Sequence, residues 1–366
     1  MKICFYSPYL PDHFGGGEKY FFDTATVLNQ KHQVYIAITD QPNLNLSNIQ
    51  EKYADRFGQG VHKFQFITTP LGTCAKAFKK LLWTAKFDAI YYVTDGSLFF
   101  SLARKNILHL QIPFTSGKTK RLERLKLSNW RYKNTNSFFT KRIIEKYWQV
   151  KINDVIQPGI DLKFYHDKGI HKEKIILNVG RFFTHLHSKK QDKLVEFFRE
   201  LRRRYPEKMT GWQLVLIGPA EDQHYAQTVA HLAADLPVTI IHQINNEELQ
   251  NWYKRASIYW HATGYGLNEE ENPEKMEHFW ISTVEAMAAG AVPIVIGSGG
   301  QPEILGRRLK DCLWITREDC LRKTIAIITK PRVRLTCQQA ARERAKKFSS
   351  QNFEKKIWQM LKNGKK

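Results

Sequence analysis

Two glutamates at an expected helix start are the residues of this chain best suited to bind hydroxyl groups. Glu277 and Glu285 have seven residues between them, and the small-residue run that begins at Glu285 ends at Gly290. A helix that begins near Phe279 places Glu277 just before its first turn and Glu285 about two turns along. Because the first backbone N–H groups of a helix have no partner within it, they bind anions. The segment therefore predicts a polar pocket that holds hydroxyls and phosphate together.

An apolar strand and a glycine turn follow this helix. We expect the strand at residues 291–296 and the turn at residues 297–300, which leads to Pro302 and Glu303. Glycine lets a backbone approach a ligand closely, so the turn is a second candidate for ligand contact. The alternative interpretation is an ordinary helix–strand unit with two solvated glutamates.

Positive side chains gather after an earlier expected strand at residues 174–179. Gly180 and Arg181 follow that strand directly, and Lys189 and Lys190 precede a helix expected to reach Tyr205. A guanidinium holds phosphate oxygens through two N–H bonds, whereas a lysine acts as a compact charge. Arg181 and Lys190 are therefore candidate phosphate ligands, Lys189 can substitute for Lys190, and surface charge is the alternative for either residue alone.

The first half alternates apolar strands with helical stretches, which indicates a parallel α/β sheet. Gly15, Gly16, Gly17 and Glu18 lie between strands expected at residues 2–7 and 33–39. Glycines at a strand-to-helix turn favour the approach of phosphate or sugar to the helix start. The spacing is not a dinucleotide fingerprint, and a flexible turn is the alternative. Further strands are expected at residues 62–68, 89–93, 106–112 and 137–140.

These segments resemble the retaining glycosyltransferases of family four, the glycosyl transferases group 1. Both the Gly15-Gly16-x-Glu18 loop and the Gly180-Arg181 element with its lysine match that family. The longest match covers the following residues: Glu277, Phe279, Ile281, Glu285, Ala286, Met287, Ala288, Gly290, Pro293, Gly299, Gly300 and Glu303. One position departs from the pattern, because Trp280 stands where glycine is typical. Its indole either narrows the sugar pocket or lies outside it.

The resemblance implies a GT-B architecture, an α/β fold in which two Rossmann-like domains face a central cleft. We expect an acceptor-side domain at residues 1–165, a nucleotide-sugar-binding domain at residues 166–348, and a helix at residues 349–366 that returns toward the first domain. A donor of this kind is a nucleotide diphospho-sugar, GDP- or UDP-linked, and the arrangement requires neither a cofactor nor a metal.

Residue roles come from the same resemblance. Glu277 would hold the sugar hydroxyls, and Glu285 would hold the ribose hydroxyls. His109 resembles the sugar-facing catalytic histidine of the first domain, although Gln111 aligns as well and a lone strand histidine is often structural. With Arg181 and Lys190 on the diphosphate, the donor-binding set is completed by Gly15, Gly16, Phe279, Ile281 and Ser282.

The function so predicted is retaining sugar transfer to a lipid-linked or glycan acceptor at the cytoplasmic face of a membrane. A catalytically silent nucleotide-sugar binder is one alternative, because of Trp280. A glycoside hydrolase is a second, because it also uses two carboxylates near a sugar. A basic nucleic-acid-binding protein is a third, but it explains only the charge.

Composition sets the outer limits of this interpretation. The 366 residues suffice for two domains, and 57 Lys and Arg against 35 Asp and Glu leave a net charge of +22 that favours anionic partners. Residues 118–133 form a basic amphipathic segment, with Leu122 and Leu125 on one helical face. An anionic membrane is a candidate partner for it and for the basic C-terminal tail, and a solvated surface helix is the alternative.

Two further features bear on location and on the acidic loop. The chain starts with an expected strand, not a signal peptide, and its five scattered cysteines suggest a reducing cytosol. The three consecutive glutamates that begin at Glu269 are expected to be solvated.

Overall fold

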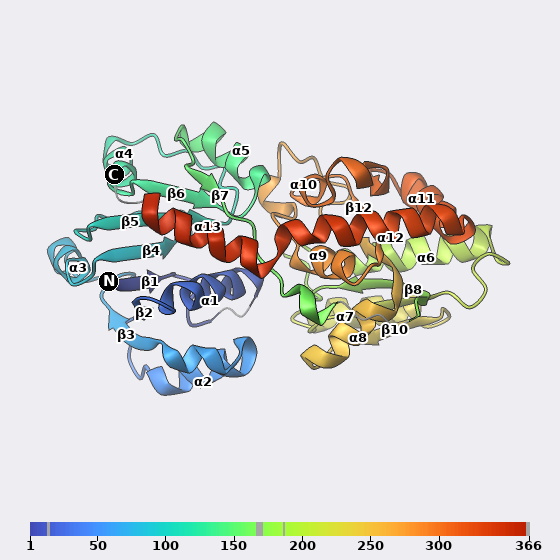
Figure 1. The fold of residues 1–366 in the computed structure, drawn as a ribbon, viewed down its shortest axis with the longest axis horizontal. Helices are drawn as coiled ribbons and strands as arrows, with labels where there is room; N and C mark the ends of the chain where they lie inside the picture. The colour runs from blue at the N-terminus through green and yellow to red at the C-terminus, as the bar shows by residue number, and fades with distance from the viewer. Residues whose placement is uncertain (13–14, 166–170, 186, 364–366) are drawn as a thin grey trace. The chain divides into compact units, whose positions relative to one another are not determined.

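The computed structural model describes residues 1–12, 15–165, 171–185 and 187–363 (Figure 1). Contacts divide the chain into two compact units. Unit 1 comprises Met1–Pro158 with Gln351–Lys366, and unit 2 comprises Gly159–Ser350. The first boundary expected from the sequence, between residues 165 and 166, falls at the edge of a segment, 166–170, that lies outside the described residues.

Unit 1 is built on a seven-stranded parallel sheet in the order β3-β2-β1-β4-β5-β6-β7. Its strands are β1 Lys2–Tyr6, β2 Gln33–Thr39, β3 Gln65–Thr69, β4 Ala89–Val93, β5 Lys105–Leu110, β6 Tyr132–Thr135 and β7 Asp154–Val155. The strand order reverses between β1 and β4, and ligands of open α/β sheets bind at the carboxyl ends of strands that flank such a reversal.

Helices cover both faces of this sheet. Their bounds are α1 Gly16–Asn29, α2 Leu46–Phe57, α3 Ala77–Thr84, α4 Arg121–Asn129, α5 Phe138–Trp148 and α13 Ser350–Asn363, with a short 3-10 helix at Gln59–Lys63. Side chains of α1, α2 and α13, such as Tyr20, Tyr53 and Ile357, share one hydrophobic cluster. Leu127 of α4 and Trp148 of α5 belong to the cluster on the other face, against which α3 also packs.

One local prediction for unit 1 is wrong. The strand expected at residues 137–140 is the start of α5, because the Ser137 hydroxyl accepts a hydrogen bond from the Thr140 N–H at 3.0 Å and caps the helix. The basic segment 118–133 is helical only over Arg121–Asn129, and its last residues enter strand β6.

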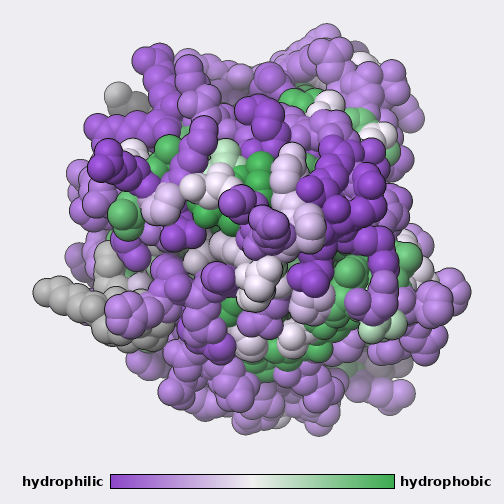
Figure 2. Space-filling view, turned by 90° about the vertical axis from the view of Figure 1, so that its right-hand side faces the viewer, coloured by the Kyte–Doolittle hydropathy of each residue, from purple (hydrophilic) through white to green (hydrophobic). Residues whose placement is uncertain are grey.

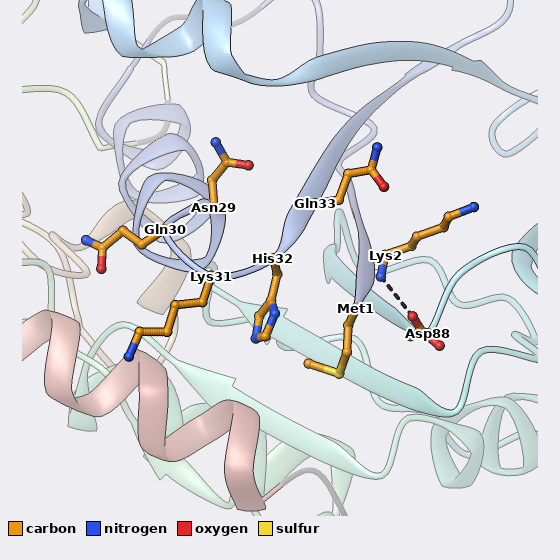
Figure 3. A pocket seen from close by; sticks show the side chains of 8 residues that line it. All are labelled: Met1, Lys2, Asn29, Gln30, Lys31, His32, Gln33 and Asp88. Atoms are coloured by element: carbon orange, nitrogen blue, oxygen red, sulfur yellow. Dashed lines mark hydrogen bonds between the residues drawn. The ribbon is translucent and has the colours of Figure 1, made fainter.

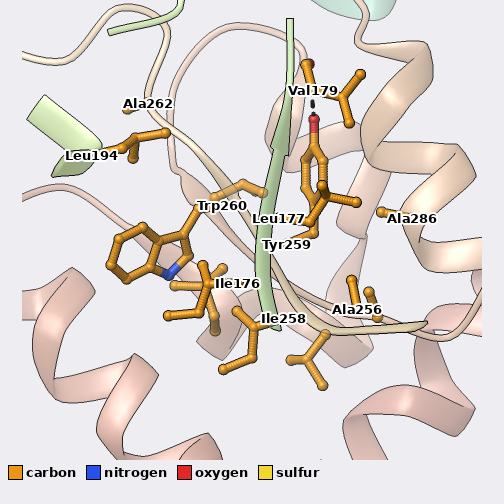
Figure 4. Packing of buried hydrophobic residues seen from close by; sticks show 14 of the residues in the cluster. Ile176, Leu177, Val179, Leu194, Ala256, Ile258, Tyr259, Trp260, Ala262 and Ala286 are labelled. Carbon is orange, nitrogen blue, oxygen red and sulfur yellow. Dashed lines mark hydrogen bonds between the residues drawn. The ribbon is translucent and has the colours of Figure 1, made fainter. Parts of the chain in front are cut away.

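Unit 2 is built on a six-stranded parallel sheet in the order β10-β9-β8-β11-β12-β13. The strands are β8 Glu173–Val179, β9 Gln213–Ile217, β10 Val238–Ile241, β11 Ala256–His261, β12 Val292–Ile296 and β13 Leu313–Trp314. Successive side chains of a strand alternate, so Tyr259 and Trp260 of β11 point to opposite sides of the sheet (Figure 4). Both are fully enclosed, because both faces of the central strands are buried.

The helices of unit 2 are α6 Gln191–Arg204, α7 Gln223–Ala233, α8 Asn246–Arg255, α9 Ile281–Ala288, α10 Gln301–Leu305, α11 Arg317–Thr329 and α12 Pro331–Ala345. In the described part of the unit, short 3-10 helices occur at Leu162–Phe164, Pro273–Lys275, Arg307–Cys312 and Lys346–Phe348. The prediction of two Rossmann-like α/β domains is thus confirmed.

Figure 2 shows one face on which hydrophilic side chains predominate and hydrophobic ones form small scattered groups. Among the described residues, no helix has the length and apolar content that a membrane crossing requires. All five cysteines are free thiols.

Candidate active site

The residues singled out in unit 2 meet where the strand order reverses, between β8 and β11. Gly180 and Arg181 follow β8, His261 ends β11, and α9 begins after the loop that contains Glu277. Since parallel strands present their carboxyl ends at one edge of the sheet, this edge is the expected ligand site of the unit.

A buried ion pair forms the centre of the site. Lys189 Nζ donates to Glu277 Oε2 at 2.8 Å, and the two side chains are only 1% and 7% exposed. Lys190, the lysine preferred from the sequence, instead takes a left-handed backbone conformation (φ 57°) immediately before α6. The structure therefore brings Lys189, the alternative, against the glutamate. An ammonium has three N–H donors, and among the described residues the hydrogen bond to Glu277 uses one of them.

Burial and charge set the ionisation of the pair. Burial alone would raise the pKa of Glu277, but the Lys189 ammonium together with the neighbouring His261 and His187 outweighs it, so the pKa of Glu277 lies below its ordinary value. Burial also lowers the pKa of Lys189, to about 8. His261 Nε2 lies 3.6 Å from the same Glu277 oxygen, and burial lowers the pKa of His261 and keeps it neutral. At neutral pH the site thus contains a carboxylate and an ammonium.

Trp280 covers this ion pair. Its ring centroid lies 3.7 Å from Lys189 Nζ, and its indole N–H donates to the Tyr259 hydroxyl at 2.7 Å. A Cβ on Gly180, directly after β8, would lie 2.9 Å from Lys189 and 3.1 Å from Trp280, so a side chain there would crowd both. Trp280 has extended backbone angles (φ −104°), and a residue with a side chain is unstrained there.

Glu285 is held by two tyrosines that sequence analysis missed. The hydroxyls of Tyr165 and Tyr253 donate to its two carboxylate oxygens at 2.8 and 2.9 Å. Burial, followed by the charge of Glu285, raises the pKa of both phenols well above the ordinary value, so they remain donors. Because each carboxylate oxygen has a further lone pair, Glu285 can also accept ligand hydroxyls. No local pattern links these three residues.

Arg181 faces a carboxylate in this structure. Its Nη1 lies 3.1 Å from both oxygens of Glu221, in the loop after β9, and its guanidinium stacks on Phe183 at 4.7 Å. The side chain is 34% exposed. It is thus anchored at the same sheet edge as Lys189.

The start of α9 keeps its amide donors. Its N-cap, Trp280, makes no side-chain capping bond, so Ile281 and Ser282 open the helix without a cap. Phe279, expected to bind the donor, instead lies in the hydrophobic core, with its ring 5.6 Å from Phe348. Its side chain has a packing role.

Several buried polar atoms near this edge have no hydrogen-bond partner among the described residues. They belong to His261, Thr263, Thr283, Ser298 and Gln301. Buried polar atoms are normally paired, so this concentration is typical of a site that binds a polar ligand.

The glycine turn after β12 packs against the chain itself. A Cβ on Gly299 would lie 2.3 Å from the Glu277 carbonyl oxygen, and one on Gly300 would lie 2.1 Å from that of His278. These glycines therefore permit close backbone packing that fixes the Glu277 loop, not the ligand approach expected from the sequence. The Gly299 N–H also donates to Glu269 Oε2 at 2.7 Å, so the prediction that Glu269 is merely solvated is wrong.

In unit 1, His109 lies in the interior. It is 0% exposed, its Nδ1 is hydrogen-bonded to Asn134, and its ring stacks on Tyr20 at 4.5 Å and Tyr91 at 5.9 Å. Burial lowers the pKa of His109 to about 4. His109 is therefore enclosed and neutral in this structure, and its catalytic role stays a prediction.

The glycine loop of unit 1 caps its own helix. Gly15 precedes α1, and its N–H donates to Glu18 Oε2 at 2.8 Å, while Gly16 is the first helical residue. A Cβ on Gly17 would lie 2.6 Å from the Gln111 side chain. Gln111, the alternative to His109, thus lies beside this loop.

Two pockets of unit 1 do not include these residues in their lining. One, of about 610 Å³, is lined by Met1, Lys2, Gln33 and Asp88 and by the end of α1 (Figure 3). It is at the amino ends of β1 and β2, opposite the edge where ligands of such sheets bind. The other, of about 510 Å³, is lined by residues 95–98 and by Phe114, Lys118 and Lys126. Within the described parts of the chain, no three His, Cys, Asp or Glu side chains form a metal-binding group.

Residues 163–344, nearly all of unit 2, match the family described as glycosyl transferases group 1. Unit 2 belongs to the glycosyl transferases group 1 family. The predicted family is thereby confirmed. The chain is 28% identical over 237 residues to the human GDP-Man:Man(3)GlcNAc(2)-PP-Dol alpha-1,2-mannosyltransferase. That match covers 60% of this chain and 46% of the human protein, so the chain spans less than half the length of this relative.

Solved structures share the fold of the whole chain. Anabaena Alr3699/HepE in complex with UDP and glucose has a TM-score of 0.68 and 15% identity, over 99% of this chain and 100% of that one. A glycosyltransferase from Rickettsia africae has a TM-score of 0.69 and 15% identity, over 99% and 98%. These structural neighbours confirm the GT-B architecture.

Proposed function

We propose that this protein is a retaining glycosyltransferase that moves a sugar from a nucleotide diphospho-sugar to a glycan or lipid-linked acceptor. One observation carries the proposal: the buried Lys189–Glu277 pair lies beside the uncapped start of α9, at the strand-order reversal of a group 1 unit. Such a site offers positive charge and N–H donors together, as a sugar-bearing diphosphate requires.

We place the donor diphosphate beside the cationic side chains of Arg181 and Lys189. Arg181 and the Lys189 ammonium neutralise its oxygens, and the amides of Ile281 and Ser282 assist. Lys190 is the competing candidate for contact with the diphosphate. Its backbone has a left-handed conformation, and non-glycine residues in this rare conformation cluster at functional sites. Glu285, oriented by its tyrosines, accepts from the ribose hydroxyls.

Transfer is favoured by charge stabilisation in the transition state. As the bond between sugar and diphosphate breaks, negative charge grows on the leaving group, and fixed cations and amides stabilise it without reorganisation. In this mechanism the cationic side chains do the work that a metal ion does in other transferases. Retention at the anomeric carbon is proposed from the family resemblance.

Glu277 acts as a hydrogen-bond acceptor in this mechanism. Its lowered pKa keeps it ionised at neutral pH, so it accepts from sugar hydroxyls and does not supply a proton. A glycoside hydrolase needs one carboxyl group with a raised pKa as its general acid. The ionisation of Glu277 therefore makes it unsuitable as the general acid of a hydrolase.

The acceptor and the location are proposed from similarity. The human relative is named for a GDP-mannose donor and a dolichyl-diphosphate-linked acceptor, whereas the Anabaena structure contains UDP and glucose. We propose a GDP- or UDP-linked donor and an acceptor at the cytoplasmic membrane face. A catalytically silent nucleotide-sugar binder is the second candidate, because Trp280 covers the cationic centre.

A donor-binding panel tests the proposal. GDP-mannose, UDP-glucose, GDP and UDP are each added, with and without EDTA, and the melting temperature is recorded. A ligand at about 100 times its dissociation constant stabilises the protein by roughly 2.7 kcal/mol. We expect one nucleotide class to raise the melting temperature with EDTA present, and Lys189→Ala to abolish the shift. If no nucleotide changes the melting temperature of the wild type, the proposal fails.

The same panel separates the two lysines and the two candidate functions. Loss of binding in Lys190→Ala but not in Lys189→Ala would move the phosphate contact to Lys190. Donor binding without sugar transfer to lipid-linked or oligosaccharide acceptors would favour the silent binder.

A further inference from the structure

Large exposed hydrophobic side chains of unit 1 gather on one side of its sheet. On α3, Phe78 is 69% and Leu82 49% exposed, and on α4, Leu122 is 56% and Leu125 52% exposed. Phe100 and Leu102, in the connection between β4 and β5, are 38% and 52% exposed. Helices α1, α2 and α13, on the opposite face, contribute no described side chain of this kind. We call α3, residues 98–102 and α4 the apolar layer.

Hydrogen bonds join the parts of this layer into one surface. The Leu102 N–H donates to the Thr84 hydroxyl at the end of α3, at 2.9 Å. The Ser101 N–H donates to the Asn129 side chain at the end of α4, at 2.8 Å. Beneath them, Leu127 and Trp130 anchor the layer in the core of the unit. The inner side chains hold the elements in place, and the outer ones face solvent.

The same layer is strongly basic. Residues 76–86 contain four lysines and no acidic residue, and residues 118–131 contain six Lys or Arg and one acidic residue, Glu123. Glu123 is already paired with Lys118 at 3.2 Å. By contrast, α2 on the other face has two acidic and two basic residues. The positive charge therefore coincides with the exposed hydrophobic side chains.

We propose that the apolar layer docks unit 1 on an anionic lipid bilayer. Hydrophobic side chains rimmed by Lys and Arg lie at the boundary between headgroups and acyl chains, where apolar burial and attraction to anionic lipid act together. A surface that binds another protein does not require so many basic residues. A surface that binds nucleic acid does not require exposed Phe and Leu side chains. Docking at a bilayer would bring a membrane-bound acceptor to the protein. This consequence for the acceptor rests on the proposed function, whereas the docking itself does not.

Vesicle sedimentation of the full chain tests this docking. Vesicles of phosphatidylglycerol with phosphatidylcholine are compared with pure phosphatidylcholine vesicles, each at low and at high salt. We expect binding only to the anionic vesicles, weakened by salt. Leu122→Ser/Leu125→Ser lowers the partition coefficient by about tenfold or more, because two apolar side chains no longer enter the bilayer. Lys79→Gln/Lys120→Gln lowers it by about fivefold per charge.

A matched control and two contrary results complete the test. Val333→Ser/Leu335→Ser alters two exposed apolar side chains of α12 in unit 2 and should leave vesicle binding unchanged. Equal loss in this control, or binding that ignores Leu122 and Leu125, overturns the inference. So does a wild-type dimer in solution that the leucine variant makes monomeric, because the layer would then bind a second copy.

Donor binding is measured on the same variants. All of them should melt near the wild-type temperature and retain the shift caused by nucleotide. A wild type that binds nucleotide but no vesicles refutes the docking alone, and one that binds vesicles but no nucleotide refutes the proposed function alone.

Discussion

Removing only one charge of the Lys189–Glu277 pair should destabilise unit 2 more than removing both charges together. Lys189→Met and Glu277→Gln each remove one charge with little change of shape. Since the two side chains are 1% and 7% exposed, each single change leaves an uncompensated buried charge, which costs about 3–5 kcal/mol. For a unit of this size this corresponds to a fall in melting temperature of roughly 6–20 °C. The double variant contains neither charge, so it should recover part of this loss.

The pH dependence of unfolding distinguishes this explanation from simple loss of packing. In the wild type the pKa of Glu277 lies below its unfolded value, so its contribution to stability is present above the unfolded pKa and is lost as pH falls. In Lys189→Met, burial without the ammonium raises the pKa of Glu277 instead. The stability of this variant should therefore decrease as pH rises through that raised value.

Urea denaturation over a range of pH measures both effects. Lys190→Ala is the control, because the described structure shows no ion pair for Lys190 and its loss should change stability by less than about 0.5 kcal/mol. The reasoning is refuted if Lys189→Met remains within about 0.5 kcal/mol of the wild type, or if the two single losses simply add in the double variant.

Three further predictions concern the donor site. Trp280→Gly, which restores the residue typical of the family, should lower the melting temperature but raise the transfer rate; loss of both refutes the view that the indole restricts the site. Glu285→Gln should weaken nucleotide affinity by roughly tenfold or more, because a charged hydrogen bond to the ribose is lost, and titration with the free nucleotide measures it; equal affinity contradicts the ribose role. Since the pKa of Lys189 is about 8, nucleotide affinity should fall as pH rises above that value, and Lys189→Arg should remove this dependence; the same pH dependence in Lys189→Arg would assign it to another group.

The sequence identified the family and the elements that carry the donor site. The spacing from Glu277 to Glu303 depends on residues close in the chain, and the resemblance follows from it. Periodicity located α6 and the strands of unit 2 to within a few residues, because a strand buried on both faces is a short apolar run. Trp280 was recognised as the departure from the pattern.

The sequence did not decide between neighbouring candidates. Lys189 and Lys190 are adjacent, and only the left-handed turn before α6 determines which one points toward Glu277. His109 and Gln111 are two positions apart, so a strand would place both on one face; only the structure shows that β5 ends at Leu110, which leaves Gln111 beside the glycine loop.

Local pattern therefore determined which kind of protein this is, and tertiary structure determined which atoms meet. A motif is a relation between residues a few positions apart, and the sequence contains it in full. The pairing of Lys189 with Glu277, and of Tyr165 and Tyr253 with Glu285, joins residues from different elements. Their distances depend on how helices and loops pack around the end of β8, because side-chain contact requires positions that only the folded sheet supplies.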